Sequence, residues 1–451
     1  MRDQSTHAQT PPIQLDDRLF LRRAMPSDLD RLLALHSLAL RYPGDEKADE
    51  RILAWTRDLM SGEHPTFDAG DFTLVEDRET GTIASSMCLI SQTWSYGGIP
   101  FQVGRVEIVC THPDYRRRGL IRAQFKEVHR WSARRGEKMQ AITGIPYFYR
   151  QFGYEMGLTL GGGRTGYATQ IRRLETGEDE AFRVRPATEA DLPFITRVYA
   201  EGARRYLVTA VRDEVMWRYE LCGKHPENVN RYALRMIETV SREPVGFLAH
   251  APHLRGGGEH LDLIWYELNP GISWQAVTPS VLRDLRAIGE AYAQESEGEF
   301  ASFSFRLGPE HPAYHVIRDR LPQARSPYAW YIRVPDLPDF LCHVAPVLER
   351  RLADSPLVSH TGKLKISFYR GGLRLAFEEG QLRAAESWQP TFGDGGDAAF
   401  PDLTFLQLLL GYRALDELDY AFADCWVGGD EARALLEILF PKQASDVWPI
   451  A

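Results

Sequence analysis

The sequence predicts a mixed α/β (α+β) fold that is divided into two or three domains. Its 451 residues are more than one hydrophobic core usually holds. Segments with strand and helix patterns alternate along the chain, and a segment near the start reappears in weaker form in the middle. Hydrophobic residues make up 44% and charged residues 25% of the chain, which is typical of a soluble globular protein.

The first region has a clear order of elements. We expect residues 1–17 to be disordered and the fold to begin with a strand at Leu19 to Arg23. A helix follows from a cap at Ser27, because leucines recur behind it at helical spacing. Two strands joined by a turn at Glu79 to Gly81 come next, and a further strand is predicted at Gln102 to Cys110.

An internal repeat indicates that the second region is a copy of the first. LRRAMPSDLDRLLALH, from Leu21, aligns with VRPATEADLPFITRVY, from Val184, and the alignment matches Arg22 with Arg185 and Asp28 with Asp191. Two copies of one fold explain such a repeat. The second copy continues through a strand HLDLIWYEL, a helix from Pro279 to Tyr292 with Thr278 as its cap, and a strand around Ser302 to Leu307.

A third region completes the predicted organisation. It opens at Tyr331 with YIRVPDLPDFL, continues in paired strands KLKISFYR and LRLAFEEGQLRAAESW, and ends in the apolar helices LTFLQLLLGY and EARALLEILF. This order predicts a separate α+β layer. The expected domains are therefore residues 18–172, 180–330 and 331–451.

Composition argues against several classes of function. The net charge of −9 gives no general attraction for nucleic acid and mildly favours a cationic substrate. The five cysteines are scattered and never in a CxxC spacing, so we expect neither disulfides nor a zinc or other metal site. No apolar run reaches the ~20 residues of a membrane helix, and the polar N-terminus lacks a signal-peptide core, so we expect a cytoplasmic protein without membrane attachment.

One stretch carries the chemical information: VEIVCTHPDYRRRGLIRAQFKEVHRWSARRG, in which an apolar strand leads to a basic turn and then to an amphipathic helix. The N-terminus of a helix presents unpaired amides and the positive end of its dipole. Gly119 allows the backbone to approach a ligand closely, and Arg116, Arg117 and Arg118 add positive charge. This pattern is typical of a pyrophosphate-binding turn.

These residues resemble the signature of the GNAT acetyltransferases, Arg/Gln-x-x-Gly-x-Gly/Ala, with Arg116 and Gly119 in its first two fixed places and Ile121 departing from the third. The run from Val109 to Arg122, the segment YRQFGYE from Tyr149 and the start of the third region are more closely similar to the enhanced intracellular survival (Eis) acetyltransferases. That family combines an active GNAT domain, a degenerate GNAT domain and a C-terminal sterol-carrier-like domain. The second region here has no basic turn, so we expect it not to bind coenzyme A.

The resemblance implies an acetyl-CoA site and two catalytic groups. The strand edge would hold the pantetheine, the turn would hold the pyrophosphate, and the next strand would close the cleft; the residues are Val109, Cys110, Thr111, Arg117, Arg118, Gly119, Leu120, Ile121, Arg122, Gly144 and Ile145. Tyr149 matches the family's general acid. A phenol can serve as an acid because it stays protonated at neutral pH. The general base would be the terminal carboxylate of Ala451, with Val447, Trp448 and Ile450 as anchors of the tail.

The expected reaction is direct transfer of acetyl from acetyl-CoA to an amine of the aminoglycoside, polyamine or lysine type. One alternative is a longer acyl donor, as in the N-myristoyltransferases, which also pair two GNAT domains. Another is a non-catalytic protein that binds acyl-CoA or a lipid in its third domain. The resemblance also implies a closed homo-oligomer, a hexamer built from two trimers.

Overall fold

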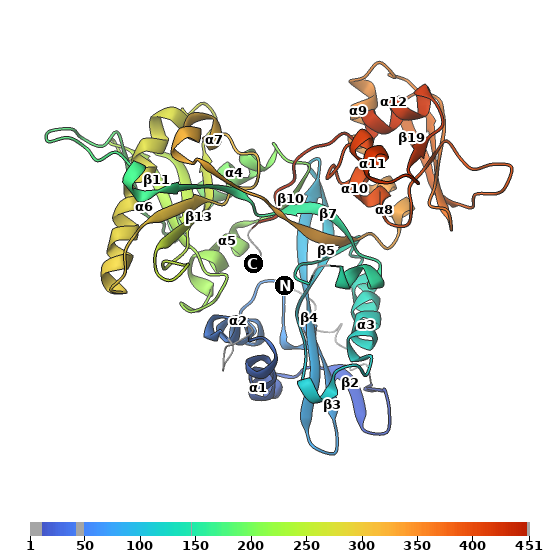
Figure 1. Ribbon diagram of the computed structural model, residues 1–451, viewed down its shortest axis with the longest axis horizontal. Helices are drawn as coiled ribbons and strands as arrows, with labels where there is room; N and C mark the ends of the chain where they lie inside the picture. Colours follow the sequence, from blue (N-terminus) through green and yellow to red (C-terminus); the bar gives the residue numbers. More distant parts are fainter. Residues whose placement is uncertain (1–10, 42–48, 146, 449–451) are drawn as a thin grey trace.

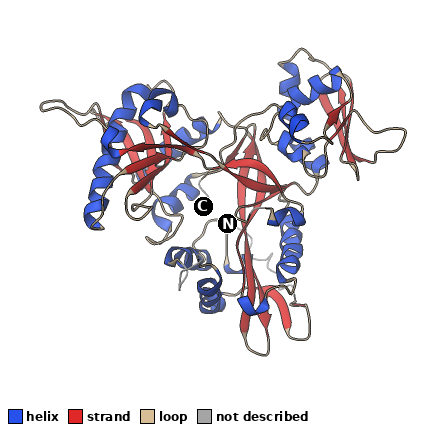
Figure 2. Cartoon of the chain, in the orientation of Figure 1, coloured by secondary structure: helices blue, strands red, loops and turns tan. Residues whose placement is uncertain are grey.

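A computed structural model describes residues 11–41, 49–145 and 147–448. The described chain forms three lobes, each built on one β-sheet, that meet at a central junction (Figure 1). Helices cover the sheets in all three lobes (Figure 2). Among the described residues, no helix combines the length and the apolar character needed to span a bilayer.

The first lobe contains a nine-stranded sheet in the order β1-β2-β3-β4-β5-β6-β16-β7, with β10 added beside the end of β4. Neighbouring strands in this sheet are antiparallel, except that β5 and β6 are parallel. The strands are β1 (Ile13–Gln14), β2 (Leu19–Arg23), β3 (Phe72–Asp77), β4 (Thr82–Tyr96), β5 (Ile99–Thr111), β6 (Met139–Ile142), β7 (Glu155–Leu160), β10 (Val208–Ala210) and β16 (Tyr328–Arg333).

The strand β1 differs from the expectation that residues 1–17 are disordered. Ile13 pairs with Leu21 of β2, and the side chains of Ile13 and Leu15 pack against Leu19 and Leu21. Burial of these apolar side chains supports order from residue 13 onward. Residues 1–10 lie outside the described part of the chain.

Helices lie on both faces of the first sheet. The helices α1 (Leu29–Ala39) and α2 (Glu50–Met60) pack on one face, in a cluster with Phe72, Ile90 and Ile108. The helix α3 (Leu120–Arg134) packs on the opposite face (Figure 1). The residues that join β5 to α3 therefore lead from the end of β5 to the face of the sheet opposite α1 and α2.

The second lobe contains a seven-stranded sheet in the order β15-β8-β14-β13-β12-β11-β9. Its strands are β8 (Gly163–Tyr167), β9 (Phe182–Pro186), β11 (Ala233–Thr239), β12 (Pro244–His250), β13 (His260–Leu268), β14 (Ser302–Phe305) and β15 (Gln323–Arg325). Its helices are α4 (Leu192–Ala203), α5 (Glu214–Arg218), α6 (Trp274–Glu295) and α7 (Ala313–Val316). The predicted strands at residues 260–268 and around residue 302 are confirmed.

The helix α6 begins earlier than the sequence predicted. Its cap is Ser273, whose Oγ accepts from the amide of Ala276 at 3.3 Å, and not Thr278. Thr278 lies inside the helix and donates to the carbonyl of Trp274 at 2.6 Å. Pro279 is therefore also internal. The helix accepts the lost backbone bond because its buried side chains continue on both sides of the proline.

The internal repeat seen in the sequence is reproduced in the side chains. Arg22 forms two parallel hydrogen bonds of 2.7 Å to the carboxylate of Asp28, and Arg185 forms two of 2.8 Å to Asp191. In both copies the Nε atom of the arginine donates to a glutamate on a neighbouring strand, Glu76 at 2.6 Å in the first and Glu238 at 2.7 Å in the second. The two copies share the same charged network as well as the same order of elements.

The first two lobes exchange strands. β7 belongs to the first sheet, but β8, which follows it, lies in the second sheet between β15 and β14. In return, β16 crosses back into the first sheet and pairs with both β6 and β7. The domain boundary expected at residue 330 falls inside β16, and the segment before residue 172 includes β8. Each of the two sheets therefore contains a strand from a segment that was expected in another domain.

The third lobe contains a five-stranded sheet in the order β19-β18-β17-β20-β21. Its strands are β17 (Gly362–Ser367), β18 (Gly372–Glu378), β19 (Gln381–Trp388), β20 (Ala398–Ala399) and β21 (Trp426–Val427), and its helices are α8 (Leu337–His343), α9 (Ala345–Ala353), α10 (Phe405–Leu409), α11 (Leu415–Ala421) and α12 (Asp430–Leu439). The paired strands and the two apolar helices predicted for this region are present.

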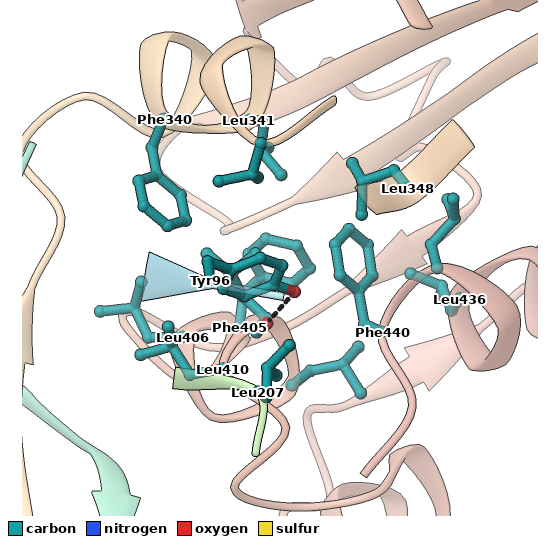
Figure 3. Packing of buried hydrophobic residues seen from close by; sticks show 14 of the residues in the cluster. Tyr96, Leu207, Phe340, Leu341, Leu348, Phe405, Leu406, Leu410, Leu436 and Phe440 are labelled. Atoms are coloured by element: carbon teal, nitrogen blue, oxygen red, sulfur yellow. Dashed lines mark hydrogen bonds between the residues drawn. The ribbon is translucent and has the colours of Figure 1, made fainter. Parts of the chain in front are cut away.

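The largest apolar cluster joins the third lobe to the first. Tyr96, at the end of β4, packs among residues of α8, α9, α10 and α12 (Figure 3). The hydroxyl of Tyr96 donates to the carbonyl of Leu409 at 2.8 Å. A continuous core of this kind holds the third lobe firmly against the tip of the first sheet.

Candidate active site

The central feature of the site is an opening between β5 and β6. The two strands pair only from Val103 to Arg105, opposite Met139 to Ala141. Beyond Arg105 the strand β5 continues to Thr111 and pairs with β4 alone among the described residues. The backbone edge of Val109, Cys110 and Thr111 on the β6 side therefore has no strand partner among the described residues, and it is the edge at which the family resemblance would place the pantetheine.

A β-bulge shapes this opening. Ile108 has a φ of 49°, and the register between β4 and β5 shifts between Ser86 and Cys88. The bulge turns Ile108 and Cys110 toward the core beneath α1 and α2, while Val109 faces the α3 side. The Cys110 thiol is buried beside Ser86, and burial raises its pKa to about 12. Cys110 is therefore suited to packing, and only its backbone faces the opening.

The basic turn lies at the start of α3. Arg117 and Gly119 have positive φ values of 64° and 74°, and the side chains of residues 116–118 are exposed. Gly119 is the cap of α3, and among the described residues no side chain accepts a hydrogen bond from the first amides of the helix. The amides of Leu120, Ile121 and Arg122 are thus open to an anion.

The residues after β6 form the other side of the opening, and β16 holds them in place. The carbonyl of Gly144 accepts from the hydroxyl of Tyr328 at 3.1 Å. The amide of Tyr147 donates to the hydroxyl of Tyr331 at 2.7 Å. Ile145 is exposed, with 58% of its surface accessible. The exchanged strand therefore positions a wall of the candidate site.

Tyr149 lies in a 3₁₀ helix, Phe148–Phe152, and only 4% of its surface is exposed. Its ring contacts Phe125 and Tyr331 at centroid distances of 6.0 and 5.9 Å, in the cluster that also contains Val109 and Ile121. A side chain at Gly144 would come within 3.8 Å of the Tyr149 hydroxyl, so this hydroxyl lies beside the opening. Within the described part of the chain it forms no hydrogen bond.

Burial raises the pKa of Tyr149 well above its usual range, and the nearby carboxylate of Glu107 raises the pKa further. The phenol is therefore fully protonated at neutral pH and keeps a proton to donate. The neighbouring rings of Phe152 and Tyr154 pack on Phe125.

His129 and His112 have structural contacts. The Nε2 atom of His129 lies 2.9 Å from the hydroxyl of Tyr154, and burial lowers the pKa of His129 to about 3. The Nδ1 atom of His112 accepts from the amide of Asp114 at 3.3 Å. These contacts give both histidines a structural role.

A cluster of buried charges beside the opening was not identified from the sequence. Arg105 and Glu107 project from β5, with 3.3 Å between Arg105 Nε and Glu107 Oε1. Glu220, from the second lobe, accepts from Arg212 at 3.0 Å and from Lys224 at 2.7 Å, and both Arg212 and Glu220 act electrostatically on Arg105. Burial raises the pKa of Glu107 and lowers the pKa of Lys224 to about 8.

The sequence does contain a signal for part of this cluster. Arg105 and Glu107 are two residues apart in an otherwise apolar strand, so both side chains point to the same face. Charged residues are rarely buried unless they are paired or functional. Their partner Glu220 could not be recognised, because it reaches the site only through the arrangement of the two lobes.

The segment after α12 passes between the lobes toward this cluster. The amide of Leu207 donates to the carbonyl of Ala444 at 2.8 Å, and the amide of Asp446 donates to the carbonyl of Val208 at 2.9 Å. Val447 is buried in the largest apolar cluster, while Trp448 packs against the core of the second lobe with Arg306 above its ring. Two of the three predicted anchors are thus packed. Ile450 and Ala451 lie outside the described residues.

The described residues contain no group of three or more His, Cys, Asp or Glu side chains arranged to hold a metal ion. The cysteines found in the structure are unpaired thiols.

Comparison with known proteins supports the fold. Residues 21–157 match the family model described as acetyltransferase (GNAT) domain. No curated protein matches the sequence. Among solved structures, similar chains include a GCN5-related N-acetyltransferase from Anabaena variabilis (12% identity, 96% of this chain and 99% of that one, TM-score 0.64) and Eis1 from Mycobacterium abscessus (13% identity, 96% and 99%, TM-score 0.59).

A third similar structure is a conserved protein of unknown function from Enterococcus faecalis, described as a probable N-acyltransferase (15% identity, 95% of this chain and 100% of that one, TM-score 0.62). At these identities the likeness concerns the fold. The chain is therefore a mixed α/β protein with GNAT-like folds, and the matched GNAT domain contains the opening, the basic turn and Tyr149.

Proposed function

We propose that this protein is an N-acetyltransferase that moves an acetyl group from acetyl-CoA to an amine. The observation that carries the proposal is the opening between β5 and β6. Around it lie an unpaired strand edge, an uncapped helix start and the protonated hydroxyl of Tyr149, and Val109, Ile121 and Tyr149 share one apolar cluster. These three features are the ones that acyl transfer from a coenzyme A thioester requires.

The described residues suit acyl-coenzyme A on two grounds. The edge of Val109 to Thr111 offers backbone groups to the amides of the pantetheine. The amides of residues 119–122 and the guanidinium groups of Arg117 and Arg118 offer donors and positive charge to the pyrophosphate. When bound, this co-substrate supplies a thioester whose carbonyl carbon is open to attack. Gly144 and Ile145 close the opposite side.

The reaction is a direct transfer. The amine nitrogen forms a bond to the thioester carbonyl carbon, and the bond from that carbon to sulfur breaks. An amide of β5 near Val109 donates to the carbonyl oxygen and stabilises its developing charge. Tyr149 donates its hydroxyl proton to the departing sulfur, and a base removes a proton from the amine. The burial that keeps Tyr149 protonated in the resting site is the physical basis of its role.

For the base we propose the carboxylate of Ala451. Trp448, the last described residue, is packed beside Trp217 and Trp265, and Arg212 lies over the rings of both tryptophans. Three further residues span at most about 10 Å, which sets the reach of the terminal carboxylate from Trp448. Glu107 is the competing candidate, because burial raises the pKa of its carboxyl and it acts electrostatically on Tyr149.

Two variants separate these candidates. Adding a short peptide after Ala451 removes the terminal carboxylate from its position, and Glu107→Gln removes the other carboxylate without changing the shape of the side chain. We expect the extended chain to lose turnover by about 10²- to 10⁴-fold while still binding acetyl-CoA. Full activity of the extended chain, together with loss of activity in Glu107→Gln, would assign the base to Glu107.

The proposed function is tested by release of free thiol from acetyl-CoA in the presence of single amines. The acceptors are an aminoglycoside, a polyamine and a lysine-containing peptide, and decanoyl- and myristoyl-CoA serve as longer donors. Thiol release that depends on one amine class establishes the transferase and its acceptor. Turnover of only the longer donors would replace acetyl by a longer acyl group. Coenzyme binding without thiol release for any combination would contradict catalysis and favour a binding protein.

The expected homo-oligomer and the expected likeness of the third lobe to sterol carrier proteins stay predictions. Sedimentation of the full chain tests the first, since a closed hexamer and a monomer differ sixfold in mass.

A further inference from the structure

A cavity of about 690 Å³ lies where the three lobes meet, and Tyr149 is not among its lining residues. The tip of the β4–β5 hairpin at Gly97 to Pro100 forms one side, α4 and the segment Thr209 to Arg212 form a second, and α9 forms a third. Gln443, in the segment that leads to the C-terminus, also contacts the cavity. Cavities of this size at domain junctions are typical of small-molecule sites.

The charge of this cavity is opposite to that of the protein. Four arginines line it, and its described lining residues include no aspartate or glutamate; the arginines are Arg204, Arg212, Arg350 and Arg351. The whole chain has a net charge of −9. A concave site of one sign with apolar walls concentrates its potential, so this cavity attracts anions within an otherwise acidic protein.

Two of the four arginines have no carboxylate partner among the described residues. Arg351 donates to the carbonyl of Leu439 at 2.6 Å and to the hydroxyl of Tyr96 at 3.3 Å, and Arg350 donates to the carbonyl of Gly97 at 3.2 Å. These acceptors are neutral. By contrast, Arg204 is paired with Glu201 and Arg212 with Glu220. The positive charge that no described carboxylate balances is therefore carried by Arg350 and Arg351 on α9.

The rest of the wall is largely apolar. Val347, one turn before Arg350 and Arg351 on α9, packs so closely on Gly97 that a side chain there would come within 2.8 Å of it. Pro100, Ala200, Ala203 and Ala210 add further apolar surface. An inorganic anion would leave this surface exposed to water, whereas an anion with an aliphatic body would cover it.

We propose that this cavity binds a small amphiphilic carboxylate, with its anionic group on Arg350 and Arg351 and its aliphatic body against Val347 and α4. The occupant contacts all three lobes and the segment at Gln443. It therefore stabilises the junction that positions the C-terminal segment. This inference does not depend on the proposed catalytic function, because none of the residues of the opening lines the cavity.

Isothermal titration of the full-length protein with decanoate tests the proposal, with saturating coenzyme A present so that the basic turn of α3 is covered. We expect one decanoate per chain. Arg350→Glu, an exposed position, should weaken binding at least about tenfold, equivalent to ~1.4 kcal/mol. Arg370→Glu is the matched control, because Arg370 is an exposed arginine of the same lobe outside the cavity. The affinity of this variant for decanoate should stay within about twofold of that of the parent.

Three results would overturn the proposal. The first is no binding of decanoate to the folded parent protein. The second is equal loss in Arg350→Glu and Arg370→Glu, which would assign the binding to general surface charge. The third is binding of inorganic phosphate as tight as that of decanoate, which would remove the role of the apolar wall.

Discussion

The first and second repeats, residues 19–142 and 182–305, have the same fold but differ where a ligand would bind. Both contain the Arg–Asp–Glu network and a parallel strand pair joined by a helix, β5-α3-β6 in one and β13-α6-β14 in the other. In the first, the helix starts at a glycine with open amides. In the second, Ser273 caps the helix, and Trp274 packs against Tyr266 and His311 at its start.

This difference indicates that the fold and the ligand site depend on separate residues. The charged network stabilises the strand and helix that open each copy, wherever the copy lies. The strand-to-helix connection can change without loss of the fold, and in the second repeat aromatic side chains fill the place that remains open in the first. Four pairs of matched substitutions test this separation.

The largest expected effect is on turnover. Tyr149→Phe should lower it by about 10²- to 10⁴-fold with little change in acetyl-CoA affinity, because only the donated proton is lost. The matched variant is Tyr314→Phe in the second lobe, a buried tyrosine whose hydroxyl donates to the carbonyl of Phe305 at 2.9 Å. It should cost about 1 kcal/mol of stability and leave turnover intact. Unchanged turnover in Tyr149→Phe would remove its assignment as the acid.

The charged networks should differ in strength. Burial acts against ionisation of Asp28, but Arg22 and the amide of Met25 still hold its pKa below the usual range, and hydrogen bonds from Arg185 do the same for Asp191. The side chain of Asp28 is 2% exposed and that of Asp191 is 12% exposed. Asp28→Asn should therefore cost about 3 kcal/mol and Asp191→Asn about half as much.

Urea unfolding at pH 7, followed by circular dichroism, measures both variants. Equal shifts of the two midpoints would show that burial does not distinguish the networks, and a larger shift for Asp191→Asn would reverse the comparison.

Each repeat also contains a buried neutral histidine, and these should act alike. Burial lowers the pKa of His36 to about 3 and that of His250 to about 4, from an ordinary value near ~6.5. The unfolded chain takes up a proton in this window and the folded chain does not. The stability contribution is therefore complete above about pH 6.5 and is lost as the pH falls toward the folded values, by about 2 kcal/mol for each histidine between pH 6.5 and pH 5.

His36→Gln and His250→Gln should each remove a similar part of the dependence of the unfolding midpoint on pH between 6.5 and 5. Because the comparison uses the slope and not the absolute stability, a general loss of packing does not affect it. A pH dependence that is the same in both variants as in the parent would show that the two histidines are protonated when folded.

The smallest effect concerns two glycines. Gly119 and Gly271 both lie between a strand and a helix, with φ values of 74° and 85°, and a side chain at either would meet no other atom within 4 Å. Alanine should cost about 1 kcal/mol at both positions, because the left-handed conformation is strained for it. Only Gly119→Ala should also weaken binding of coenzyme A, as measured by titration. Equal affinities in both variants would argue against the turn as the pyrophosphate site.

The sequence predicted what depends on local residues. The strand at residues 260–268 was recognised to the residue because turn-forming residues bound its apolar run on both sides. The basic turn and the strand before it were recognised because their spacing is fixed within one segment. The start of α6 was misplaced because Pro279 was interpreted as a first-turn residue, whereas packing of the helix on the second sheet outweighs the lost hydrogen bond.

The features that escaped prediction depend on contacts between distant segments. The alternation of side chains in a strand shows which face is buried, but not which strand lies beside it. Nothing within YAWYIR indicates that β16 pairs with β6 and β7. For the same reason Glu220 could not be connected to Arg105, and the tyrosines of β16 that hold Gly144 and Tyr147 were not expected at the site.

The exchanged strand β16 also sets the order of events during synthesis. Within the described sheet, β7 pairs only with β16, so it has no partner until residue 333 has left the ribosome. Residues 161–327 take roughly 8 to 33 s to translate, and over that interval the nascent first lobe exposes unpaired strand edges. Tyr328 and Tyr331 are translated after the rest of the first lobe, and they fix the loop beside Tyr149. A chain interrupted in its second lobe therefore has an incomplete site, and the protein gains this site only after both lobes have been made.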